Sequence, residues 1–213
     1  EMGVNLYQAA HCTAIREMRD IGTAIFDADG HTVALANWVP MLMNAMEPAI
    51  QEIKKEFPIE DLKPSEGLLT NDPFKGGQHV NDIVLFTPIH HGGRVIGLAC
   101  ANAHHVDVGG GAPGTNAGAT EVFHEGIVFP PLKVDLSGDW MKSVFGRIFG
   151  NNIRVPEKTL HDFDAQIGAC RTGERRILAL VEKYGVDTVL AFMKEIQDYS
   201  ERMTRATISE IAD

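Results

Sequence analysis

The chain has 213 residues, of which 44% are hydrophobic and 23% are charged. This balance predicts a soluble protein with an ordinary packed core, and it excludes a disordered polar chain, a collagen-like chain and a disulfide-bonded miniprotein. The 29 acidic residues outnumber the 19 basic residues, which gives a formal net charge of −10. We therefore expect no nucleic acid partner and no binding to an anionic membrane surface. No run approaches the roughly 18 apolar residues that a transmembrane helix needs.

The N-terminal segment and the cysteines indicate the cellular compartment in which we expect the protein. The segment has neither a basic n-region nor an apolar h-region, so we expect no signal peptide. Because it does not begin with methionine, we expect a trimmed or partial polypeptide. Cys12, Cys100 and Cys170 are too far apart for a CxxC motif or a disulfide framework. This spacing predicts free thiols in a reducing compartment, the cytoplasm.

The first third of the chain predicts helices around a hairpin. Asp29 and Gly30 supply the tight turn, because glycine adopts the positive φ that such a turn needs. Pro58 ends the second helical pattern. The predicted elements, in order, are a helix over 4–19, strands at 24–26 and 32–36, a helix over 43–57 and a strand at 68–70.

The middle of the chain predicts a buried hairpin. Two apolar runs, at 83–89 and 94–101, are joined by the turn sequence His-His-Gly-Gly at 90–93. The second run is apolar on both faces, which indicates a central strand covered on both sides.

After residue 131 the pattern becomes helical. Helical spacing begins near Leu160, a break is predicted at Gly173, and Gly185 follows the end of this helix. A last helix is predicted from Val186 onward. The whole pattern indicates an α+β fold with a mixed or antiparallel sheet core, and the candidate metal site described below falls on its hairpins. We expect a core over 1–135 and a helical segment over 136–213 packed on that core.

Two polar runs flank the buried hairpin and carry the chemistry. His79 and Asp82 precede its first strand, and His104 and Asp107 follow its second strand. In an antiparallel hairpin the start of one strand lies beside the end of the other, so the two His/Asp pairs should converge. Imidazole and carboxylate ligands together suit zinc, manganese, iron or cobalt. Spacing alone leaves structural hydrogen bonding about equally open.

Two glycine runs lie in the same loops, at 76–77 and 109–111. Neither is followed by Lys-Ser/Thr, and neither opens a βαβ unit, so neither predicts a nucleotide site. Tight turns that hold the ligands are the favoured interpretation. Close approach to a substrate or a phosphorylated intermediate is the alternative.

These motifs resemble the hydantoinase B/oxoprolinase family. Asn-Asp-Pro-Phe-x-Gly-Gly-x-His-x-x-Asp at 71–82, Ala-His-His-x-Asp-Val-Gly-Gly at 103–110 and Glu-Val-Phe-x-Glu-Gly at 121–126 carry the resemblance. It continues through Arg-Asp at 19–20 and covers essentially the whole chain. The family includes B-type subunits of ATP-dependent hydantoinases, caprolactamase, and acetone and acetophenone carboxylases. Its chains are usually much longer, so the sequence resembles their N-terminal portion.

The resemblance implies one divalent transition metal, for which zinc and manganese are the first candidates. The ligands that it implies are Asp20, His79, Asp82 and His104. Asp20 rests on the resemblance alone, and His104 is preferred to His105 because the carboxylase branch keeps only the first histidine of the pair.

Two further residues are implied to be catalytic, namely His105 and Asp107. Asp107 would be a carboxylate behind the ligands or facing the substrate. Strand alternation sends His105 away from the metal, toward either the substrate or the protein interior.

The resemblance also implies an activity and partners. The first expectation is hydrolysis of an activated cyclic amide, a lactam or hydantoin, in an ATP-dependent multi-subunit enzyme. The alternatives are a carboxylase that adds CO2 or bicarbonate to an activated ketone, and a non-catalytic scaffold subunit. ATP and magnesium are expected on a hydantoinase A-type partner subunit. A C-terminal portion or a companion B-type chain is a second expected partner, and the substrate is a small molecule.

Overall fold

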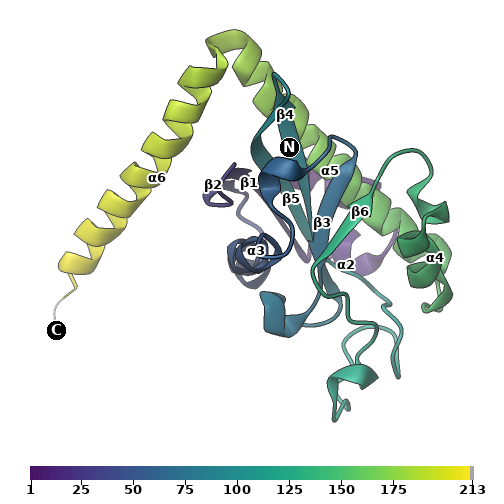
Figure 1. The fold of residues 1–213 in the computed structure, drawn as a ribbon. Helices are drawn as coiled ribbons and strands as arrows, with labels where there is room; N and C mark the ends of the chain where they lie inside the picture. The colour runs from purple at the N-terminus through teal and green to yellow at the C-terminus, as the bar shows by residue number, and fades with distance from the viewer. Residues whose placement is uncertain (212–213) are drawn as a thin grey trace.

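The computed structural model describes residues 1–211 and confirms the α+β class. Within these residues, one six-stranded sheet has the order β2-β1-β5-β4-β3-β6, and all neighbouring strands are antiparallel (Figure 1). The strands are β1 (Ile21–Asp27), β2 (Thr32–Leu35), β3 (Glu66–Thr70), β4 (Asp82–His91), β5 (Arg94–His104) and β6 (Leu132–Asp135). The α-helices are α1 (Met2–Ala9), α2 (Thr13–Arg16), α3 (Pro40–Ile53), α4 (Val144–Asn151), α5 (Pro156–Tyr184) and α6 (Val186–Ser209).

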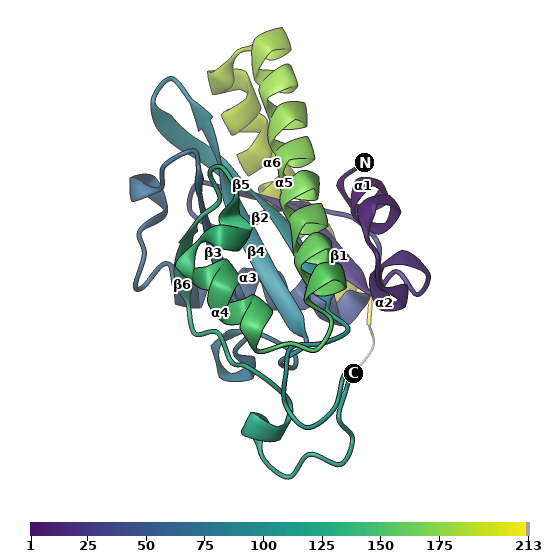
Figure 2. The ribbon, with the colours of Figure 1, turned by 90° about the vertical axis from the view of Figure 1, so that its right-hand side faces the viewer.

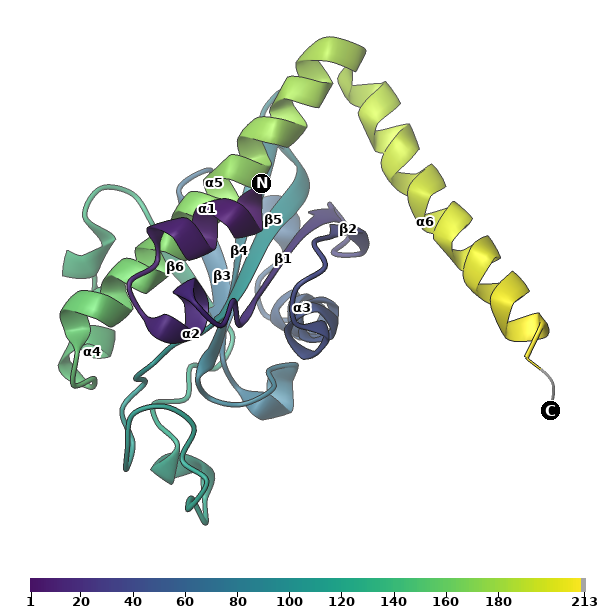
Figure 3. The same ribbon diagram turned by 180° about the vertical axis from the view of Figure 1, so that it is seen from behind.

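Helices cover both faces of the sheet. The long helix α5 crosses one face with α1 beside it, and α3 lies on the opposite face (Figures 1 and 3). Two clusters of buried side chains result. On β4, Ile83 and Leu85 enter the cluster under α5, whereas Val84 and Phe86 enter the cluster under α3. Burial on both faces explains why the two hairpin strands are continuous apolar runs in the sequence.

The predicted hairpin of β4 and β5 is confirmed, with Asp82 opposite His104 at its open end. Gly92 and Gly93 form its turn, both with positive φ. Long loops leave this open end of the sheet, and the segment between β5 and β6 projects farthest (Figure 2).

The single helix predicted over 4–19 is wrong. Helix α1 ends at Ala9, Ala10 is extended, and α2 starts at Thr13. The buried carboxylate of Asp162 in α5 accepts hydrogen bonds from the backbone N–H groups of His11 (2.6 Å) and Cys12 (3.2 Å). These amides therefore bond to a distant side chain, which local helical spacing could not reveal.

The break predicted at Gly173 is also wrong, because α5 continues from Pro156 to Tyr184. A Cβ at Gly173 would lie 2.7 Å from Met2 Sδ and 3.1 Å from Ala99 Cβ. The glycine thus allows α5 to pack closely on the sheet and on α1.

Other differences concern short elements at the edges. The sequence prediction missed β6, a four-residue edge strand paired with β3, and α4, which follows it. Helix α3 begins at Pro40, where proline suits the first helical turn. After residue 135 the structure has α4, α5 and α6, and the division into a core and a helical segment stays a prediction. Since α5 shares a core cluster with the strands, it packs on the same core.

The sequence analysis expects free thiols and no transmembrane helix. Cys12, Cys100 and Cys170 are buried and free. Within residues 1–211, no helix combines the length and the apolar character that crossing a bilayer requires.

Replacing Gly173 with leucine should lower the free energy of unfolding by about 2–3 kcal/mol, since overpacking forces α5 away from the sheet. Gly168 is the matched control in the same helix, because no atom lies within 4 Å of a Cβ built there. Gly168→Ala should raise the free energy of unfolding by up to about 1 kcal/mol through helix propensity. Urea denaturation measures both changes, and equal effects would contradict the packing explanation.

Candidate metal centre

Strand register brings the predicted ligands to one edge of the sheet. Strand β4 begins at Asp82, β5 ends at His104, and Asp20 immediately precedes β1. Asp82 pairs directly with His104, and Ile21 pairs with Ala103. Antiparallel pairing therefore places the beginnings of β1 and β4 on either side of the end of β5.

The side chains at this edge are close enough to share an ion. His104 Nδ1 lies 3.1 Å from Asp82 Oδ1 and 3.8 Å from Asp20 Oδ2. His79 Nε2 lies 3.5 Å from Asp82 Oδ2. One donor atom from each of His79, Asp82 and His104 lies within 4.8 Å of the others. Donors at such separations can surround an ion at roughly 2.0–2.3 Å.

A backbone clamp fixes the end of β5. The His104 N–H donates to the Asp20 carbonyl at 3.1 Å, and the His105 N–H donates to the Asn81 carbonyl at 2.8 Å. Asn81 Nδ2 returns a hydrogen bond to the His105 carbonyl at 2.9 Å. The residues next to the three strand ends are thus bonded to one another, which restricts how far the ligands can separate.

The loop that carries His79 is anchored by Asn71, which is fully buried. Asn71 Nδ2 donates to the carbonyls of Val80 (2.6 Å) and Ile127 (2.9 Å), and its Oδ1 accepts from the Phe129 N–H at 2.6 Å. One side chain therefore ties this loop to the returning segment before β6.

The same loop makes a tight turn at Gly76, where φ is +96°. A Cβ there would lie 2.4 Å from the backbone nitrogen of Ala49 in α3. Close approach to the helix and positive φ both require glycine at this position, as the tight-turn interpretation expects.

The cluster concentrates negative charge in a partly buried place. Burial raises the pKa of Asp20 above its ordinary value; the imidazole of His104 opposes this rise, and the carboxylate of Asp82 adds to it. Asp82 is 2% exposed, and its Oδ2 has no hydrogen-bond donor among the described residues. A cation would satisfy this buried acceptor and offset the repulsion between the carboxylates. The two imidazoles and the Asp82 carboxylate, with the Asp20 carboxylate beside them, are donors of the kind that suits a transition metal.

His105 lies on the other side of the strand, toward α5. It is fully buried, its Nε2 is 2.6 Å from Gln166 Oε1, and Phe149 and Phe163 pack near its ring. Burial lowers the pKa of His105 below its ordinary value, and the hydrogen bond with Gln166 only partly opposes this. Of the two directions that the sequence left open, the structure has the side chain in the protein interior. A catalytic role for it stays a prediction.

Asp107 is fully buried in the loop after β5. Its carboxylate accepts from the N–H of Gly109 (3.0 Å), from the backbone N–H of Arg154 and from Arg154 Nη1 (3.0 Å). Arg154 also donates to the carbonyls of Gly109 (3.2 Å) and Gly110 (2.6 Å). This ion pair shapes the second glycine run, and a catalytic role for Asp107 also stays a prediction.

Several polar residues that build the centre had no predicted role. Asn71, Asn81 and Arg154 lie in or near recognisable motifs, but their partners depend on the sheet register. A buried carboxylate such as Asp107 needs a compensating charge, which Arg154 supplies, but the burial that creates this need is visible only in the structure.

Comparisons with known proteins agree with this architecture. The family model described as hydantoinase B/oxoprolinase matches residues 1–213. An uncharacterised protein of Methanocaldococcus jannaschii is 36% identical over 99% of this chain and 38% of its own length. A Pseudomonas protein (strain NS671), named as a putative B-type subunit of a D-/L-hydantoinase, is 32% identical over 100% of this chain and 37% of its own length.

Solved structures show the same fold. The ATP-dependent caprolactamase of Pseudomonas jessenii matches with a TM-score of 0.90 and 27% identity, over 100% of this chain and 36% of that chain. A nucleotide-free acetone carboxylase matches with a TM-score of 0.79 and 19% identity, over 92% of this chain and 26% of that chain, which shows the fold alone. The chain spans less than two fifths of the length of these relatives. Since the family model matches the whole sequence, the chain belongs to the hydantoinase B/oxoprolinase family.

Proposed function

We propose that this chain is the metal-binding catalytic part of an ATP-dependent, multi-subunit enzyme that hydrolyses an activated cyclic amide, a lactam or hydantoin. The convergence of His79, Asp82 and His104, with Asp20 beside them, carries the proposal. Relatives named as a hydantoinase subunit and an ATP-dependent caprolactamase support the reaction class.

In this proposal Asp20, His79, Asp82 and His104 hold one zinc or manganese ion. Such an ion, when bound, polarises a carbonyl or phosphoryl oxygen and lowers the pKa of a coordinated water. The chain supplies the negative charge and the fixed imidazoles at the end of the hairpin. The contacts of His105 and Asp107 favour an indirect role for both, behind His104 and along the second glycine run.

ATP and magnesium would bind to a hydantoinase A-type partner subunit in the cytoplasm. Neither glycine run has the sequence of a phosphate-binding loop. The turn at Gly76 also packs directly against the backbone of α3, which leaves no space for a phosphate there. The partner would activate the substrate by phosphorylation, and this chain would act on the activated product.

A ketone carboxylase is the second candidate reaction, because the acetone carboxylase shares the fold. We favour the hydrolase because the relatives of higher identity include a hydantoinase subunit and a caprolactamase, at 32% and 28%. A non-catalytic scaffold subunit would keep the motif but bind no metal, so metal content separates it from both enzymes.

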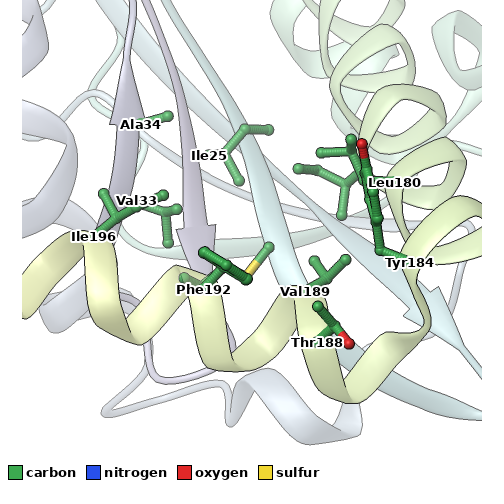
Figure 4. Close-up of a pocket in the computed structure, with 11 residues that line it drawn as sticks. Ile25, Val33, Ala34, Leu180, Tyr184, Thr188, Val189, Phe192 and Ile196 are labelled. Atoms are coloured by element: carbon green, nitrogen blue, oxygen red, sulfur yellow. The ribbon is translucent and has the colours of Figure 1, made fainter.

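Helix α6 provides a surface for a second partner. It projects away from the sheet, and Phe192, Ile196, Tyr199 and Met203 form a stripe along it that is between 46% and 62% exposed. Their spacing of four, three and four residues is typical of a helix that packs against another helix. The stripe opens into an apolar groove of about 540 Å³ between α6, the end of α5 and the β1–β2 hairpin (Figure 4).

We assign this groove to the polypeptide that makes up the rest of a B-type subunit. The caprolactamase matches all of this chain, α6 included, yet the match covers only 36% of the caprolactamase chain. A large part of that protein therefore lies outside the matched fold and is available to cover an apolar helix face.

His79→Ala should remove the metal from the purified chain, because losing one of four ligands leaves an incomplete coordination shell. Elemental analysis should find about one zinc or manganese per wild-type chain and none in the variant. Full metal occupancy in His79→Ala would contradict the assignment of the ligands.

His104 and His105 should behave differently when each is replaced by alanine. His104→Ala should lose metal and activity together. His105→Ala should retain the metal and lose at most about ten- to a hundred-fold in turnover, since its contact is with Gln166. An empty site in His105→Ala with a filled site in His104→Ala would show that the assignment is wrong by one residue.

Phe192→Ser combined with Met203→Ser should weaken assembly with the rest of a B-type subunit, since serine removes the apolar contact area. Co-elution in gel filtration measures the assembly. Lys194→Ser with Arg205→Ser, on the opposite face of α6, is the control and should leave it intact. Unchanged co-elution of the apolar variant would contradict the assignment of the groove.

A further inference from the structure

Gln166 occupies an unusual place behind the metal centre. It is fully buried in α5 and lies over the seam between β4 and β5. Its Nε2 donates to the carbonyls of Ile83 (2.8 Å) and Ala101 (3.0 Å), one on each strand. Its Oε1 lies 2.6 Å from His105 Nε2. The side chain therefore uses both of its N–H groups and its oxygen on three partners.

These bonds determine the protonation of His105. Both N–H groups of the Gln166 amide point to carbonyl oxygens, so its oxygen must accept, and His105 must donate from Nε2. A flipped amide would place Oε1 against two carbonyl oxygens and leave no donor for them. The Gln166 oxygen therefore fixes a hydrogen of the His105 ring on Nε2.

The partners of Gln166 flank the proposed metal ligands. Ile83 directly follows Asp82, His105 directly follows His104, and Asp82 is the cross-strand partner of His104. Gln166 thus bonds to the residue after each of the two buried ligands from the opposite side of the sheet.

We propose that Gln166 is a positioning residue of the metal centre, which holds Asp82 and His104 in register through Ile83 and His105. This inference rests on the proposed function, because it concerns the same ligands. Helix α5 keeps its apolar contacts without this amide, since Phe163, Ile167 and Cys170 remain in the core cluster. Loss of the amide should therefore displace the ligands without unfolding the domain.

The test is the affinity of the purified chain for Zn²⁺, measured by competition with a chelator. Gln166→Met keeps the length of the side chain but removes the three hydrogen bonds, and it should weaken Zn²⁺ binding by about ten- to a hundred-fold. The matched control is Thr172→Val in the same helix. Thr172 is also buried, accepting from Asn5 Nδ2 at 2.9 Å and donating to the Gly168 carbonyl at 3.0 Å.

Thr172→Val should lower stability but leave the affinity for Zn²⁺ unchanged. Nitrogen-15 NMR of the histidine rings gives a second reading, which a general loss of stability would not alter. His105 should carry its hydrogen on Nε2 in the wild type and lose this fixed tautomer in Gln166→Met.

The outcomes separate the two proposals. A wild-type chain that binds no Zn²⁺ would overturn the proposed function and this inference with it. A wild-type chain that binds Zn²⁺ no more tightly than Gln166→Met, or a wild-type His105 protonated on Nδ1, would overturn only the role of Gln166. Equal weakening in Thr172→Val would do the same, since it would show a general effect of stability.

Discussion

The register between β4 and β5 is the constraint on which the centre depends. Asp82 stands opposite His104 only in this pairing, and a slip by one residue would send the side chains of one strand to the other face. Such a slip would also exchange the two apolar clusters that β4 and β5 fill. Burial of one aliphatic side chain stabilises the fold by about 1.5–3 kcal/mol. The many buried side chains of the two clusters therefore fix the strand register, and with it the position of the ligands, far more strongly than contacts among the ligands do.

Buried amides convert that register into a defined site. Asn71 and Gln166 each bridge backbone groups of separate segments, and Asn81 donates from its side chain to the His105 carbonyl; each of the three is nearly or fully buried. A buried amide is favourable only when its donors and acceptors are satisfied, so these side chains tolerate few alternative arrangements. The loops around the centre are long, and the hydrogen bonds of these amides fix their positions. Apolar contacts alone are less directional and would not do so.

Much of this arrangement could be predicted from the sequence, because it depends on local patterns. The apolar runs of β4 and β5 and the glycine turn between them predicted the hairpin, and the hairpin predicted that the pairs His79/Asp82 and His104/Asp107 would meet. His79, Asp82 and His104 do meet, whereas Asp107 is paired with Arg154. The break at Ala10 could not be predicted, since it depends on Asp162, about 150 residues away. Gly173 gave a misleading signal because glycine permits close packing as well as helix ends. Asp20 required the family resemblance, since a carboxylate before a strand has no distinctive pattern.

The central claim is that one transition metal binds where β1, β4 and β5 meet. Crystals of the chain grown with zinc and measured at the zinc absorption edge test it most directly. The account predicts one strong anomalous peak bonded to His79, Asp82 and His104, with Asp20 completing the shell. A peak elsewhere with this cluster empty, or a cluster joined only by hydrogen bonds at saturating zinc, would contradict it.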